Sequence, residues 1–236
     1  MPTRYFRLDR FLSQQLQVSR SALRPLLAAG RVRVNGAVAR DRQRRIGPFD
    51  RVECDDQLLG DGTRRYLMLN KPAGVVSATT DATHPTVLDL LPEAAREGLH
   101  LAGRLDFNST GLVLLTNDGE WSRRLSLPDS GVWKRYRVTV ERPLRPEDVA
   151  AFSAGMHFEF EGLVTRPARL EILAEQEARV FLQEGRYHQI RRMFAQTGNR
   201  VMTLHREAVG SVVLDETLAP GECRALTSNE VEQIDA

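Results

Sequence analysis

One polar segment of the chain, residues 103–119, carries the residue best suited to chemistry. It has the sequence GRLDFNSTGLVLLTNDG, in which Asp106 stands in a glycine-bounded loop just after Arg104. The apolar run that follows, residues 112–115, is bounded by turn residues and is typical of a buried strand. A carboxylate on a tight loop beside a rigid sheet can serve as a nucleophile or a base. The alternative for an isolated loop aspartate is that it caps a turn.

The same segment resembles the signature of the RsuA/RluB-type pseudouridine synthases, G-R-L-D-x-x-[ST]-x-G followed by an apolar run and a T-[ND]-[DN]-G end. The chain meets this pattern at Gly103, Arg104, Leu105, Asp106, Ser109, Gly111, Thr116, Asn117, Asp118 and Gly119. Such enzymes break the C–N glycosidic bond of a uridine in RNA, turn the base and rejoin it through carbon. The resemblance implies that Asp106 is the catalytic aspartate. It also implies that Arg104 binds the substrate, at a phosphate or in the space left by the flipped base.

A second segment, residues 181–194, has the sequence FLQEGRYHQIRRMF and resembles the [EQ]-G-[RK]-x-[HR]-Q-[IV]-[RK]-R-M stretch of the same enzymes. The resemblance implies that Arg191 pairs with the catalytic aspartate and holds it ionised. Leu182 matches an apolar residue on the pocket floor, and Arg192 is a candidate phosphate contact. Taken alone, Arg191 could be a helix-surface residue and Leu182 an ordinary core residue of a strand.

Two shorter segments complete the candidate site. Residues 134–136, KRY, match a K-x-Y segment of the family, and Tyr136 is expected to stack on the uracil and to act in catalysis. Outside this context, a tyrosine in a strand is more often a half-buried packing residue. Residues 70–74, NKPAG, match a KPxG turn of the family, which makes Lys71 a further substrate-binding candidate.

The charges of the chain are unevenly distributed. Residues 1–51 hold twelve Arg and three Asp, a balance of +9, whereas the remainder holds 21 basic and 28 acidic residues, a balance of −7. A basic module on a mildly acidic body indicates a polyanionic partner for the module. The alternative is a solvated face in a chain that has 31 Arg and two Lys.

The basic module, residues 1–58, resembles an S4 RNA-binding domain. Helical spacing of leucines predicts two helices, and the alternating residues 31–36 enter an Asn-Gly turn that predicts a hairpin. The resemblance rests on Leu8, Asp9, Leu12, Ser19, Arg20, Gly30, Val32, Val34, Asn35, Gly36, Asp50 and Val52. Arginine side chains of such a module pair with RNA phosphates. The candidates are Arg7, Arg20, Arg24, Arg31, Arg40, Arg42, Arg44 and Arg45.

We expect a glycine-rich linker at residues 59–64 and a catalytic domain at residues 65–236. The pattern in the second domain predicts helices at residues 120–127 and 146–155 and a helix that begins near residue 184 and ends before Gly198. Strands are predicted at residues 65–69, 112–115, 134–141, 168–173, 179–183, 201–204 and 211–214. Many strands with few crossover helices predict an α+β fold whose core is a large mixed, mainly antiparallel sheet.

Several classes of protein are excluded by the composition. No apolar run is long enough for a transmembrane helix, and the first residues have no signal-peptide pattern. Cys54 and Cys223 suggest no disulfide framework, which fits a reducing cytoplasm. The five histidines lack metal-ligand spacing, and neither a P-loop nor a dinucleotide fingerprint is present. We therefore expect no metal, no cofactor and no membrane, and a monomer in the cytoplasm.

The resemblance covers nearly the whole chain and is strongest to the small-subunit branch of the family, through residues 70–87 and 118–122. It implies a synthase that acts on 16S rRNA, at the uridine at position 516, either free or in an assembly particle. Two alternatives remain: a synthase for a large-subunit rRNA uridine, and a noncatalytic S4-type assembly protein. A glycosidase with Asp118 as its second acid is disfavoured, because residues 117–119 form a turn pattern.

Overall fold

The computed structural model describes residues 5–60, 62–127, 130–159 and 161–234. The chain divides into two compact units, an N-terminal unit (Met1–Arg64) and a C-terminal unit (Arg65–Ala236). Each unit has its own buried core, because the apolar side chains of each form separate clusters.

The N-terminal unit has two short helices on a small sheet. The helices are α1 (Leu8–Gln15) and α2 (Leu23–Ala28). The strands are β1 (Phe6–Arg7), β2 (Val32–Val34), β3 (Ala37–Val38), β4 (Arg45–Ile46), β5 (Val52–Cys54) and β6 (Gln57–Gly60). Strands β3, β2, β5 and β6 pair in that order, and β1 pairs with β4. The predicted helix–helix–hairpin order is confirmed, and the β2–β3 turn has positive φ angles at Asn35 and Gly36, as a tight hairpin requires.

The end of this unit differs from the prediction. Strand β6 includes Leu59 and Gly60, which the sequence analysis assigned to the linker, and Gly60 pairs with Val52 of β5. Glycine-rich composition suggested a flexible segment, but a glycine at the edge of a sheet can also continue a strand. Asp61, at the centre of the expected linker, lies outside the described residues.

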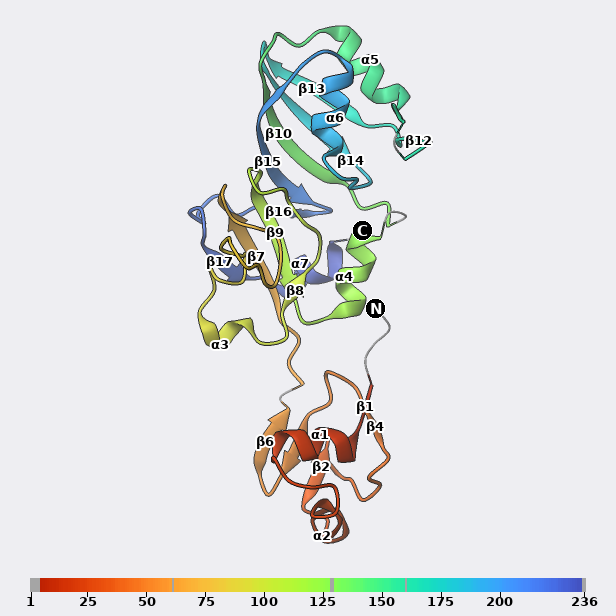
Figure 1. Cartoon of the computed structure of the whole chain (residues 1–236), viewed down its shortest axis with the longest axis vertical. Helices are drawn as coiled ribbons and strands as arrows, with labels where there is room; N and C mark the ends of the chain where they lie inside the picture. The colour runs from red at the N-terminus through yellow and green to blue at the C-terminus, as the bar shows by residue number, and fades with distance from the viewer. Residues whose placement is uncertain (1–4, 61, 128–129, 160, 235–236) are drawn as a thin grey trace. The chain divides into compact units, whose positions relative to one another are not determined.

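A nine-stranded sheet forms the frame of the described part of the C-terminal unit, with the order β13-β14-β10-β15-β9-β7-β17 and β8 and β16 attached to β9 and β15 (Figure 1). Its strands are β7 (Tyr66–Lys71), β8 (His100–Leu101), β9 (Thr110–Thr116), β10 (Lys134–Val140), β13 (Arg169–Ala174), β14 (Glu177–Leu182), β15 (Val201–Val209), β16 (Val212–Val213) and β17 (Cys223–Ala225). A separate ribbon pairs β11 (His157–Phe158) with β12 (Leu163–Val164). The pairing of β9 with β15 is parallel and the other strand pairings of this sheet are antiparallel. The predicted α+β fold with a mixed, mainly antiparallel sheet is confirmed.

Helices cover both faces of this sheet. They are α3 (Glu93–Arg96), α4 (Gly119–Ser126), α5 (Pro146–Ala154), α6 (Gln189–Gln196) and α7 (Ser228–Gln233). Figure 1 shows α5 and α6 beside the half formed by β10, β13 and β14, and α4 and α7 beside the other half. Side chains of β9 alternate between two cores, Val113 in the core with α5 and α6 and Leu114 in the core with α4. Because both faces of β9 are buried, residues 112–115 are continuously apolar rather than alternating.

Two residues of the family segments, Asp118 and His188, stand immediately before helices. Helix α4 begins one residue before its predicted start, and the Asp118 Oδ1 accepts hydrogen bonds from the backbone N–H groups of Glu120 (3.0 Å) and Trp121 (3.1 Å). Asp118 is thus an N-cap, which removes the basis for a second catalytic acid. Helix α6 begins at Gln189 rather than near residue 184, because His188 has a left-handed backbone conformation (φ 49°). The sequence pattern did not predict β8, β11, β12, β17, α3 or α7, all of which are short.

The parallel contact between β9 and β15 depends on Gly111. This residue pairs with Arg206 and has φ 101°, and an added Cβ would lie 2.4 Å from the Arg206 carbonyl oxygen and 2.8 Å from its nitrogen. A side chain at position 111 would therefore force the two strands apart.

We expect Gly111→Ala to lower the free energy of unfolding of the C-terminal unit by about 2–5 kcal/mol, through strain and steric overlap. Both tryptophans, Trp121 and Trp133, belong to this unit, so urea unfolding followed by tryptophan fluorescence measures it. Gly119→Ala is the control, since Gly119 lies in a helix with nothing within 4 Å of an added Cβ. Equal midpoints for the two variants would contradict the role of Gly111.

Candidate active site

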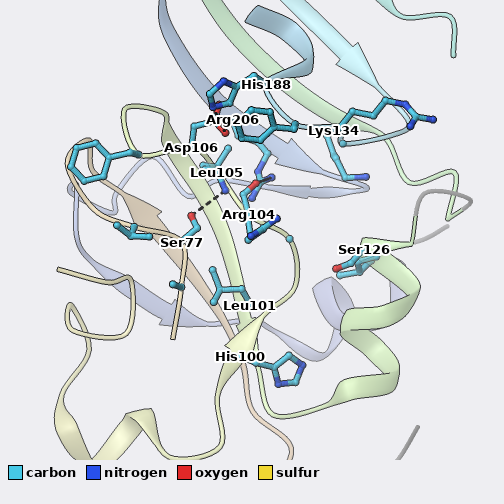
Figure 2. Close-up of a pocket in the computed structure, with 18 of the residues that line it drawn as sticks. Ser77, His100, Leu101, Arg104, Leu105, Asp106, Ser126, Lys134, His188 and Arg206 are labelled. Carbon is cyan, nitrogen blue, oxygen red and sulfur yellow. Dashed lines mark hydrogen bonds and ion pairs between the residues drawn. The ribbon is translucent and has the colours of Figure 1, made fainter. Parts of the chain in front are cut away.

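A pocket of about 850 Å³ lies in the C-terminal unit and is lined in part by residues of strands β8, β10 and β15. It is lined by residues 76–79, 100–101, 103–107, 125–127, 134, 136, 185–188 and 206. Figure 2 shows Asp106, Arg104, His188, Lys134 and Arg206 around this hollow. The pocket brings together the loop that carries Asp106, strand β10 and the turn before α6.

Asp106 lies in the loop between β8 and β9, with 31% of its side chain exposed. Its carboxylate is 3.9 Å from the Arg191 Nε and 3.6 Å from the His188 Nε2. Arg191 also donates a hydrogen bond to the backbone carbonyl of Val201 (3.3 Å). The expected partners Asp106 and Arg191 therefore stand at ion-pair distance, without the bidentate hydrogen bonds that a guanidinium can form.

Three buried side chains support the loop of Asp106. The Lys71 Nζ donates to the backbone carbonyls of Pro72 (2.9 Å), Phe107 (3.1 Å) and Ser109 (2.8 Å). The Ser77 Oγ accepts from the Leu105 N–H (3.1 Å). Arg206 donates from Nε to the Leu112 carbonyl (2.7 Å) and from Nη1 to the Arg104 carbonyl (3.2 Å). The position of the carboxylate is thus fixed by groups that bind the backbone on both sides of it.

Lys71 was predicted to bind the substrate, but the structure places it outside the pocket lining. Its side chain is fully buried, lies outside the pocket lining, and directs its ammonium to three carbonyls of the chain itself. Burial lowers the pKa of Lys71 to about 8, and the negative charge of Asp106 opposes this shift. In this geometry Lys71 acts on the site through the loop that it holds.

Tyr136 and Leu182 lie on neighbouring strands, β10 and β14, and both are buried. Tyr136 lines the pocket, whereas Leu182 packs in the apolar core beneath it and does not line the pocket. Lys134, two residues before Tyr136, also lines the pocket and donates to the Val132 carbonyl (3.1 Å). Burial, together with the positive charge of Arg206, lowers the pKa of Lys134 to about 8, and the charge of Glu184 opposes this shift.

The two arginines expected to bind RNA near the pocket have different surroundings. Arg104 is exposed and lines the pocket. Arg192 makes a bidentate ion pair with Glu161, with both distances 2.6 Å, and its guanidinium lies 3.7 Å from the centre of the Phe158 ring. The hydrogen bond from Arg192 lowers the pKa of Glu161. Arg192 lies outside the pocket lining, and its donors are already engaged by a carboxylate.

The arginine candidates of the N-terminal unit also divide into two groups. Arg7 pairs with Asp9, and Arg31 pairs with Asp55. Within the part of the chain that the structure describes, the others form no ion pair: Arg20, Arg24, Arg40, Arg42, Arg44 and Arg45. All of these are exposed except Arg44, which is half-buried. No carboxylate of the described residues pairs with the guanidinium groups of this second group, and that of Arg45 lies 5.4 Å from the centre of the Tyr5 ring.

Sequence reasoning missed His188 and Arg206 as site residues. His188 stands within the second family segment, but its left-handed backbone, which directs it to Asp106, has no signal in the sequence. Arg206 lies in the middle of β15, where an arginine is normally exposed, and here only 2% of it is accessible. The described residues contain no group of three potential metal ligands and no helix long and apolar enough to cross a membrane.

Comparison with known proteins gives one consistent family. Residues 65–196 match the model of the RNA pseudouridylate synthase family, and residues 6–52 match the S4 domain. The chain is 53% identical to the ribosomal small subunit pseudouridine synthase A of Pseudomonas aeruginosa, over 95% of this chain and 98% of that protein. It is 44% identical to the protein of the same name from Escherichia coli, over 97% and 99% of the two chains.

A solved structure agrees with these relatives. The crystal structure of a pseudouridylate synthase superposes with a TM-score of 0.71 at 40% identity and covers 97% of this chain and 99% of that one. The matched family segment contains Asp106, Tyr136 and Arg191, which the fold brings to one pocket or its edge. This chain therefore belongs to the RNA pseudouridylate synthase family and carries an S4 domain before its catalytic domain.

Proposed function

We propose that this protein converts one uridine of the small-subunit 16S rRNA, at position 516, to pseudouridine, with Asp106 as the catalytic carboxylate and without a cofactor. The names of the relatives with 44–53% identity over nearly the full length support the small subunit as the target. The observation that carries the catalytic assignment is the Asp106 carboxylate, which lies in the pocket within 4 Å of two basic side chains.

The reaction breaks the bond between C1′ of the ribose and N1 of the uracil, turns the base, and forms a bond between C1′ and C5. Asp106 attacks the sugar or the ring, or stabilises a glycal-type intermediate, and each of these roles requires an ionised carboxylate. Arg191 forms an ion pair with this carboxylate at 3.9 Å and helps to orient it. The base must leave its stack to enter the pocket, where the ring of Tyr136 offers a face for stacking.

The other site residues have supporting roles in this proposal. Lys71 positions the loop of Asp106, and Leu182 supports Tyr136 from the core. Arg104 contacts the RNA at the open side of the pocket. A phosphate can bind Arg192 only by displacing Glu161 from its guanidinium.

The N-terminal unit, a proposed S4 domain of residues 1–58 in our sequence assignment, serves as an RNA clamp without a part in the chemistry. Its balance of +9 over residues 1–51 and its unpaired arginines support this role. We place the protein in the cytoplasm as a monomer, in keeping with its two unpaired cysteines. Mapping pseudouridines in the rRNA of a deletion strain tests the target, and loss of a large-subunit site instead would reassign it.

Asp106→Asn should abolish turnover and leave RNA affinity nearly unchanged, because the variant removes the essential charge from a surface that is otherwise basic. Tritium release from RNA labelled at C5 of uridine measures turnover, and filter binding measures affinity. Asp89→Asn is the matched control, since Asp89 is half exposed and lies outside the pocket lining. Near-normal tritium release by Asp106→Asn would disprove the catalytic assignment.

Arg191→Ala should lower the single-turnover rate by roughly 10²-fold or more, since it removes the positive charge that pairs with the Asp106 carboxylate. Arg191→Lys should keep part of the activity, because an ion pair at 3.9 Å needs a positive charge but not a planar fork. Arg200→Ala, an exposed arginine outside the pocket, is the control. If Arg191→Ala and Arg200→Ala have the same rate, Arg191 does not act on Asp106.

Replacing Arg40, Arg42, Arg44 and Arg45 together by Gln should weaken RNA binding most at low salt. Each lost phosphate contact should reduce the slope of log affinity against log salt by roughly 0.7 to 0.9. Replacing Arg7 and Arg31 by Gln is the control, because carboxylates already pair with both. Binding isotherms at several salt concentrations measure the slopes. An unchanged slope for the fourfold variant would show that this cluster is only a solvated surface.

A further inference from the structure

Arg206 is a buried arginine that lines the pocket and has one donor nitrogen without a partner among the described residues. It lies on β15, lines the pocket, and only 2% of it is accessible. Its Nε and Nη1 donate to the backbone carbonyls of Leu112 and Arg104. Its Nη2 is shielded from solvent and has no hydrogen-bond partner among the described residues. The hydrogen bonds that support the loop therefore use Nε and Nη1 of this guanidinium and leave Nη2 without a partner in the described part of the chain.

The charge of Arg206 is also uncompensated. No carboxylate of the described residues forms an ion pair with it, and arginine stays protonated in proteins. A buried cation without an anion is costly, and proteins retain such groups mostly where they have a function. The described pocket lining contains four cationic residues, Arg104, Lys134, Arg186 and Arg206, against a single carboxylate, that of Asp106. The pocket is thus built for a ligand that is, or becomes, negatively charged.

Strand pairing places Arg206 beside the residue that would stack on the base. Tyr136 of β10 and Arg206 of β15 are direct partners in the antiparallel pairing, and both line the pocket. Side chains of directly opposed residues stand on the same face of a sheet, about 5 Å apart at Cβ. A base seated on the ring of Tyr136 would therefore lie next to the Arg206 guanidinium.

We propose that Arg206 is a catalytic residue whose Nη2 donates a hydrogen bond to a carbonyl oxygen of the flipped uracil and stabilises the charge of the departing base. This inference rests on the proposed function. When the C1′–N1 bond breaks, its electron pair stays on N1 and is shared with the carbonyl oxygens. C1′ becomes electron-poor, and the negative charge of the Asp106 carboxylate stabilises it without a lasting bond. C5 then bonds to C1′, the C5 proton leaves and N1 takes up a proton, so the composition is unchanged.

A donor in a site shielded from water stabilises such a developing charge more than it stabilises the neutral base, which is how it accelerates the reaction. The substituent at C5 of the base offers a way to measure this. Fluorine at C5 withdraws electrons and stabilises the uracil anion, so a 5-fluorouridine target needs less help from Arg206.

The test compares RNA with uridine and RNA with 5-fluorouridine at the target position, under single-turnover conditions. Consumption of the target nucleoside is followed by nuclease digestion and chromatography. Arg206→Met should slow consumption of uridine by roughly 10²-fold or more, with a clearly smaller loss for 5-fluorouridine. Arg206→Lys, which keeps the charge, should lie between the wild type and Arg206→Met on uridine.

Ser77→Ala is the matched control, because it removes a hydrogen bond to the same loop, at Leu105, without a change of charge. Its rate loss should be equal for the two RNAs. Equal losses for the two RNAs in Arg206→Met as well would reduce Arg206 to a structural support and overturn the inference. If the wild-type protein consumes neither RNA, the proposed function itself fails, and the inference fails with it.

A measurement on the wild type keeps the inference testable if both Arg206 variants fail to fold. Barbiturate is a pyrimidine base that is anionic at neutral pH, whereas uracil is neutral and similar in shape. Competition measured by ligand-observed NMR should show that barbiturate binds several times more tightly than uracil. Equal binding of the two bases would overturn the proposal.

Discussion

The active site depends on the parallel contact between β9 and β15. Asp106 precedes β9, whereas Tyr136 belongs to β10 and Arg206 to β15, so the proposed catalytic carboxylate and the groups around it come from different halves of the sheet. The two halves meet where Gly111 lies against the backbone of Arg206. Because Gly111 has no side chain, the two strands approach closely. This approach sets the distance between Asp106 and the side of the pocket that Tyr136 and Arg206 form.

The electrostatics of the pocket follow from how the cations are used. Lys71 and Arg206 direct hydrogen bonds to backbone carbonyls of the Asp106 loop, so positive charge and loop geometry come from the same side chains. Arg191 adds an ion pair to the carboxylate itself. Arg192, its neighbour in sequence, is turned to Glu161. Adjacent arginines on one helix therefore have different partners, because successive residues point about 100° apart.

Much of the fold and of the site was predictable from the sequence. The run at residues 112–115 predicted β9, and the family segments identified Asp106, Tyr136 and Arg191, because these features depend on local pattern and residue type. The burial of Arg206 was not predictable, since it arises from strands that are distant in sequence. His188 escaped notice because a left-handed residue other than glycine leaves no trace in periodicity. The short strands and helices were not predicted either, because tertiary contacts rather than a periodic pattern hold their residues.

The buried ammonium of Lys71 has a further consequence for how the protein responds to alkaline solution. Its pKa of about 8 lies below the ordinary value of 10.5, so the unfolded chain binds this proton more tightly than the folded one. As the pH rises from 8 towards 10.5, this group therefore adds to the stability of the fold. The same loss of a proton leaves two N–H donors for three carbonyls of the Asp106 loop. Mild alkali therefore removes a hydrogen bond from the Asp106 loop, while the contribution of Lys71 to the stability of the fold increases.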